Sequence, residues 1–169
     1  MSHSQDVYRD SFESALHRMA DATEDRMILT TLFRPQDEEF EDILGTTWTE
    51  LENRCLVEPA NKKGPIQYRL TGAGWIMGLQ LSDKWTSDAF RAKAGRLSQT
   101  LKHHVKGRNA DDLVLLETVC EESTLCDGFV YNAIESHLLR ELNGTYDAGW
   151  DEGGRGRHIL IPENFGLHR

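Results

Sequence analysis

The stretch YRLTGAGWIMGLQL, residues 68–81, decides the fold of this chain. Apolar and polar residues alternate as far as Leu70, as they do in a half-buried strand. Thr71 follows at the position where a helix N-cap would stand. Gly74 and Gly78 then leave one side of the next segment smooth, so that another helix can approach it closely. The stretch therefore predicts a short strand that runs directly into a helix.

Two helices are predicted near the N-terminus. Apolar residues recur at helical spacing over residues 5–20 and again over residues 24–33. Pro35 ends the second helix, because the residue before a proline avoids the helical region. An acidic segment with three apolar residues, DEEFEDILG over residues 37–45, follows and closes on a glycine.

A further helix and a turn complete the approach to the strand. Thr47 and Glu50 have the spacing of a capping box, which predicts a helix from Thr47 to Glu58. The turn sequence NKKGP at residues 61–65 then leads into the alternating run that ends at Leu70.

The second half repeats this order of elements. Ser82 and Asp83 are expected to cap a long basic helix that runs to Lys106. Helical patterns follow over residues 110–123 and 128–142, and then two strand-like segments separated by a flexible tip, TYDAGW, DEGGRGR and HILIP, residues 145–162.

These patterns predict a mainly α fold with small β-hairpins, in the α+β class. Two similar lobes would be joined by a long helix. The expected parts are an N-terminal helix, a first lobe, a basic linker helix and a second lobe, at residues 1–23, 24–82, 83–108 and 109–169.

The charge is distributed very unevenly along the 169 residues, whose net charge is -9. Residues 84–108 hold seven basic residues and one acidic residue. Residues 1–60 and 109–169 are strongly acidic, with net charges of -9 and -8, while residues 61–83 carry a net charge of +2. A basic strip attracts phosphate, whereas acidic surfaces repel nucleic acid. The strip could equally pair with the acidic lobes of its own chain.

Several classes of protein are disfavoured by composition. No apolar run approaches the roughly 20 residues that span a bilayer, and the polar N-terminus is no secretory signal. Three cysteines, Cys55, Cys120 and Cys126, form no CxxC motif. We therefore expect a cytoplasmic protein with no membrane contact and no disulfide framework. His103 and His104 are adjacent and diverge on a helix, so we expect no metal site and no cofactor.

Residues 24–81 resemble the winged-helix domain of bacterial regulators. The resemblance is carried by the order of helices, by the lysine turn, and by the strand from Tyr68 through Leu70 and Thr71 to Gly74. Residues 111–166 resemble a second, more divergent winged helix. The resemblance implies a DNA-recognition helix at Thr47–Glu58 and a wing at residues 61–65.

The leading hypothesis is a non-enzymatic transcription regulator that contacts DNA. Sequence reading would come from the recognition helix, through Thr47, Thr49, Asn53 and Arg54. Phosphate contacts would come from the wing, the adjoining strand and the basic helix, through Lys62, Lys63, Arg69, Arg91, Lys93, Arg96, Lys102, Lys106 and Arg108. We expect a homodimer that uses the N-terminal helix and the long basic helix, since two-fold operators match two-fold proteins.

Two alternatives remain. The recognition helix carries Glu50, Glu52 and Glu58, which oppose phosphate. The chain could therefore be an adaptor that binds another protein through acidic helices and exposed tryptophans, Trp85 and Trp150. An enzyme of unknown type is the third reading, although no nucleophile, base or cofactor can be assigned.

Overall fold

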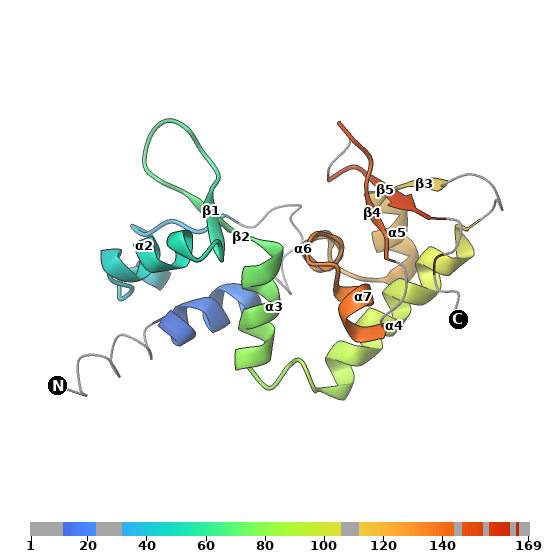
Figure 1. The fold of residues 1–169 in the computed structure, drawn as a ribbon, viewed down its shortest axis with the longest axis horizontal. Helices are drawn as coiled ribbons and strands as arrows, with labels where there is room; N and C mark the ends of the chain where they lie inside the picture. The colour runs from blue at the N-terminus through green and yellow to red at the C-terminus, as the bar shows by residue number, and fades with distance from the viewer. Residues whose placement is uncertain are drawn as a thin grey trace.

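The computed structural model describes residues 12–22, 32–105, 112–143, 147–153, 156–162 and 165. Figure 1 shows two lobes side by side, with α3 (Gly72–Leu81) between them. The first lobe holds a helix over residues 12–22 together with η1 (Glu38–Phe40), α2 (Gly45–Asn53), β1 (Val57–Pro59) and β2 (Tyr68–Leu70). The second lobe holds α4 (Asp88–His103), β3 (Asp112–Leu115), α5 (Leu116–Ser123), α6 (Asp127–Glu135), α7 (Leu138–Asn143), β4 (Gly149–Trp150) and β5 (His158–Ile161).

The predicted α+β class with small hairpins is confirmed, because both sheets are small and antiparallel. In the first lobe Phe33 bridges to Tyr68 of β2, and β2 pairs with β1. In the second lobe the strand order is β3–β5–β4. In the first lobe the last strand in the sequence, β2, lies between Phe33 and β1. In the second lobe the last strand, β5, lies between β3 and β4. The strand that comes last in the sequence is therefore the central one in both lobes.

The opening stretch folds as its local chemistry predicts. Thr71 is the N-cap of α3, and its hydroxyl accepts a hydrogen bond from the Gly74 amide at 3.1 Å. The same hydroxyl donates to the Cys55 carbonyl at 2.6 Å, which ties the start of α3 to the end of α2. One threonine thus caps a helix and fastens the hairpin to it.

Two glycines of α3 allow close approach from different elements. A Cβ on Gly78 would lie 2.6 Å from the Ala20 Cβ and 2.8 Å from the Leu16 carbonyl oxygen, so the helix over residues 12–22 crosses there. A Cβ on Gly74 would lie 1.9 Å from the Leu56 carbonyl oxygen. The predicted approach of a helix is confirmed at Gly78, whereas at Gly74 the neighbour is the chain leading into β1.

Among the described residues, one continuous apolar core runs through both lobes. At its centre Trp75 of α3 is fully buried, with its ring 5.7 Å from that of Phe129 on α6 and 6.2 Å from that of Phe90 on α4. A Cβ on Gly72 would lie 2.6 Å from the Glu135 carbonyl oxygen, so the start of α3 packs directly against the backbone at the end of α6. Among the described residues, no helix combines the length and apolar character needed to cross a membrane.

Several predicted boundaries in the first lobe were wrong. Phe33 is not helical but exchanges two backbone hydrogen bonds of 2.7 Å with Tyr68, and residues 24–31 lie outside the described residues. The helix predicted at Thr47–Glu58 begins at Gly45 and ends at Asn53. It ends early because Cys55 takes a left-handed φ of 58° and turns the chain into β1.

The long basic helix also begins later than predicted. Ser87 caps α4 by accepting a hydrogen bond from the Phe90 amide at 3.2 Å, while Ser82 is the C-cap of α3. The segment predicted as a helix from residue 110 instead enters β3, where Val114 is buried between exposed Leu113 and Leu115. Alternation of burial, which is typical of a strand, holds there until α5 begins.

Candidate nucleic-acid interface

Thr47 does not lie on the surface of α2, and its predicted contact with DNA is wrong. The helix begins two residues before Thr47, with Leu44 as N-cap, so the proposed capping box does not form. Thr47 is fully buried, and within the described part of the chain its hydroxyl has no hydrogen-bond partner. The apolar stripe of the helix, which includes Trp48 and Leu51, carries Thr47 into the core.

The other predicted residues of α2 and its end are accessible. Thr49 and Asn53 are exposed, and the Thr49 hydroxyl donates to the Gly45 carbonyl at 3.1 Å. Arg54 follows the helix with its side chain 59% exposed. Its guanidinium lies over the Phe12 ring, 5.0 Å from the ring centroid, which fixes its position beside the helix end.

The three carboxylates that oppose phosphate binding all interact with neighbours in the chain. Glu50 accepts from Arg54 Nε at 2.6 Å, and Glu58 lies 3.8 Å from Arg69. Glu52 is hydrogen-bonded to Tyr68. The pKa of Tyr68 is raised, mainly by burial and further by the charge of Glu52 and this hydrogen bond. Ion pairing of Glu50 and Glu58 reduces the repulsion that these two carboxylates would exert on a phosphate backbone.

The hairpin loop, residues 60–67, is held in one shape by its own polar groups. The Asn61 side-chain amide donates to the carbonyls of Lys63 and Pro65 at 2.8 and 2.7 Å, and its oxygen accepts from the Gln67 amide at 2.8 Å. Gly64 takes a φ of 82°, which glycine adopts without strain.

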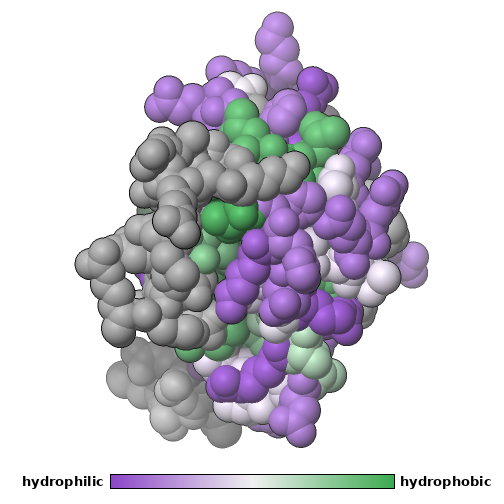
Figure 2. Space-filling model, turned by 90° about the vertical axis from the view of Figure 1, so that its right-hand side faces the viewer, coloured by the Kyte–Doolittle hydropathy of each residue, from purple (hydrophilic) through white to green (hydrophobic). Residues whose placement is uncertain are grey.

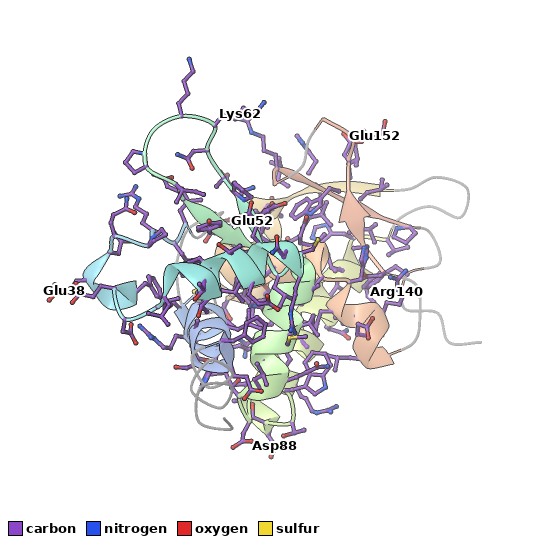
Figure 3. The ribbon with its side chains drawn as sticks, turned by 60° about the vertical axis from the view of Figure 1, so that its left-hand side comes forward. Glu38, Glu52, Lys62, Asp88, Arg140 and Glu152 are labelled. Carbon is purple, nitrogen blue, oxygen red and sulfur yellow. The ribbon has the colours of Figure 1, made fainter. Side chains whose placement is uncertain are left out.

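Both predicted lysines of the hairpin loop face solvent. Lys62 and Lys63 are exposed, and Figure 3 shows the Lys62 side chain pointing away from the body of the molecule. Arg69 is on β2, with its side chain 27% exposed and beside Glu58. The loop lysines are therefore the cations best placed to meet a phosphate backbone from this lobe.

Arg34 is a cation near this loop that the sequence analysis missed. When the side-chain amide of Gln67 is oriented with its oxygen toward Arg34, this oxygen accepts hydrogen bonds from Nε and Nη2 of Arg34 at 3.2 and 3.3 Å. Arg34 is exposed and is brought here by the pairing of Phe33 with Tyr68. The pairing of Phe33 with Tyr68 joins segments far apart in the sequence, and no local pattern around Arg34 indicates it. The sequence analysis therefore did not find Arg34.

The cations of α4 do not extend the surface of the hairpin loop. Figure 1 places the loop and α4 on opposite sides of the molecule. In Figure 3 Lys62 and Asp88, the first residue of α4, lie at opposite ends of the view. The loop lysines and the cations of α4, which were both expected to contact phosphates, therefore do not share one face of the molecule.

On α4 the predicted residues serve the second lobe. Arg91, Arg96 and Lys102 are exposed, while Lys93 is half-buried with its ammonium 5.8 Å from the Phe129 ring centroid. Arg96 Nε donates to the Ser123 carbonyl at 3.2 Å, joining α4 to α5. Lys106 and Arg108 lie outside the described residues.

The surfaces expected for dimerisation are covered within the chain itself. Leu16 and Met19 of the N-terminal helix are fully buried in the core, as are Leu97 and Leu101 of α4. An amphipathic stripe signals burial but not the identity of the partner, and here the partner is the rest of the chain.

The tryptophans expected as contacts for a protein partner are not free anchors. Trp85 and Trp150 are half-buried and pack against the core. The Trp150 indole donates to Glu135 at 3.0 Å, and its ring lies 5.3 Å from that of Tyr131.

Among the described residues, no group of three or more histidine, cysteine or acidic side chains could hold a metal ion. Comparisons with family models, with curated proteins and with solved structures found no match to this chain.

Proposed function

We propose that this chain is a cytoplasmic, non-enzymatic winged-helix regulator whose first lobe binds double-stranded DNA. In this proposal α2 is the recognition helix and the hairpin loop is the wing. Thr49, Asn53 and Arg54 would face the groove, and Lys62 and Lys63 would contact phosphates. Arg34 and Arg69 would add positive charge beside the wing.

The observation that carries the proposal is the charge arrangement of this lobe. Its carboxylates Glu50 and Glu58 lie beside arginines of the same chain, while the loop lysines project into solvent. An acidic protein can bind DNA when one surface presents unopposed cations, because the interaction depends on local charge. The pre-ordered loop also lowers the entropy cost of holding its lysines against a phosphate backbone.

The two lobes support the same proposal through their topology. Each has a helix, a first paired segment, further helices and a hairpin, with the last strand in the middle of the sheet. The resemblance implies helices followed by a hairpin, and this part of the order is common to both lobes. In the second lobe the corresponding helices are acidic, so we assign DNA contact to the first lobe alone.

The test is fluorescence anisotropy with a random-sequence duplex of about 30 base pairs across salt concentrations. The variant Lys62→Gln/Lys63→Gln should weaken binding and reduce the log–log salt slope by about 1.8, as expected for two lost phosphate contacts. The matched control, Arg91→Gln/Lys102→Gln, removes the same charge from α4 and should change binding little. Absence of binding at low salt, or an equal loss in the control, would refute the proposal.

A protein partner is the second candidate. The observation in its favour is apolar exposure on the second lobe, where Leu113 is 54% and Leu115 is 47% exposed. Neighbouring exposed leucines on one strand are typical of an interaction site.

A further inference from the structure

The second lobe contains a cavity that the proposed DNA contact does not use. Its volume is about 550 Å³, within the range of ligand-binding pockets. It lies between the start of α5, the start of α6 and the turn between β4 and β5. Its wall combines apolar, acidic and basic side chains, which include Leu115, Leu116, Glu117, Glu121, Asp127 and Arg157.

Negative charge converges on this cavity. Burial raises the pKa of the Cys120 thiol to about 12, and the charges of Asp127, Glu117 and Glu121 add to the shift. These carboxylates therefore act on one point from different elements. Glu117 and Glu121 also stand four residues apart on α5, where like charges repel. Among the described residues of the wall, Arg157 is the only basic one, beside Glu117, Glu121 and Asp127, so this described part of the cavity favours a cationic occupant.

An apolar strip leads to the cavity. Leu113 and Leu115 point outward from β3, and Leu115 also lines the cavity. Their partners across the sheet on β5 are Leu160 and His158, both half-buried. Figure 2, which views this end of the molecule, shows hydrophobic surface exposed among hydrophilic side chains. An occupant should therefore combine apolar side chains with positive charge.

The hairpin loop of the first lobe has this chemistry. Its tip carries Lys62 and Lys63, and Ile66 follows with 43% exposure. Asn61 and Gly64 hold the loop in shape, so little conformational entropy is lost when it docks. The cavity therefore complements the loop in charge and in apolar character.

The loop meets the cavity of another copy more readily than its own. The loop and the β4–β5 turn, which lines the cavity, belong to different lobes and stand apart along the long axis of Figure 1. In Figure 3 Lys62 and Glu152, which belongs to the β4–β5 turn beside the cavity, lie toward the same side of the molecule. Two copies facing each other about a two-fold axis can thus exchange loops, which makes a closed and symmetric contact.

We propose that two copies of this chain form a reciprocal dimer, in which the hairpin loop of each docks at the acidic cavity of the other. The dimer surface then differs from the helices expected from the sequence. It covers Lys62 and Lys63, so DNA bound by the first lobe and a second copy of the chain compete for the same lysines. Dimerisation would therefore regulate DNA binding.

The test is sedimentation velocity over a range of protein concentrations, with no DNA present. Both Lys62→Glu/Lys63→Glu and Glu117→Lys/Glu121→Lys should raise the dimer dissociation constant by more than about tenfold, because each places like charges in contact. Mixing the two variants should restore the dimer, since in the mixed pair every loop again meets a cavity of opposite charge. Glu38→Lys/Glu41→Lys is the matched control, with the same charge change on exposed residues of the first lobe.

A protein that stays monomeric at all concentrations would overturn this proposal. So would a dimer that persists in Glu117→Lys/Glu121→Lys, or failure of this variant to form a dimer when mixed with Lys62→Glu/Lys63→Glu. Circular dichroism verifies folding of each variant, and Leu113→Ser on the exposed strip provides an uncharged variant that should also weaken the dimer. The assembly readout is independent of the anisotropy readout. Loss of one proposal therefore leaves the other standing.

Discussion

At the scale of single residues, Gly74 shows how one position can decide the packing of two elements. Its missing side chain lets the Leu56 carbonyl approach the first turn of α3, next to the Thr71 cap. Backbone, unlike the end of a flexible side chain, cannot move aside cheaply. The glycine is therefore required by contact, although its position in a helix is unfavourable in itself.

We expect Gly74→Ala to lower the free energy of unfolding by about 1–3 kcal/mol or more, the usual cost of overpacking a core. The matched change Gly95→Ala, where a Cβ would meet nothing within 4 Å, should raise stability by about 0.5–1 kcal/mol. Urea unfolding measures both. Equal effects of the two substitutions would contradict the role assigned to Gly74.

At the scale of elements, an ion pair joins the turn between α6 and α7 to the residues before β4. His137 Nδ1 lies 3.0 Å from Asp147, and the Asp147 side chain is only 5% exposed. Burial raises the pKa of Asp147, although the hydrogen bond to His137 and the charge of His137 act in the opposite direction. The folded state therefore holds a proton on this carboxyl more tightly than the unfolded chain does.

This shift predicts a pH-dependent effect of Asp147→Asn. The contribution of a raised carboxyl pKa is fully present below the unfolded value of about 3.9 and is lost as pH rises through the folded value. The stability of the asparagine variant relative to wild type should therefore increase with pH over this window and then level off. Chemical unfolding at several pH values measures it, and a difference that stays constant or falls with pH would contradict the assignment.

At the scale of the whole molecule, the two lobes share one core and should unfold together. Helix α3 packs on both lobes: Trp75 contacts rings of α4 and α6 in the second lobe, while Gly74 and Gly78 lie against Leu56 and Leu16 of the first lobe. Contacts of this kind make opening of one lobe expose apolar surface of the other. The lobes are thus similar in topology without being independent units of stability.

We expect the slowest-exchanging amides of α2 and of α6 to report the same free energy of opening, equal to that of global unfolding. Native-state hydrogen exchange measures these values. Gly72→Ala should lower both by similar amounts. A change confined to the second lobe, or two separate unfolding transitions, would show that the lobes unfold independently.

The sequence by itself determined the strand, cap and helix at residues 68–81, the α+β class, and the exposure of Lys62 and Lys63. These features follow from local chemistry: alternation, an N-cap hydroxyl and a turn rich in polar residues and glycine. Only the tertiary structure decided that Thr47 is buried, that Arg34 joins the hairpin loop, and that the cations of α4 face away from it. Those outcomes depend on contacts between segments far apart in the chain, and periodicity shows that a face is buried without showing what covers it.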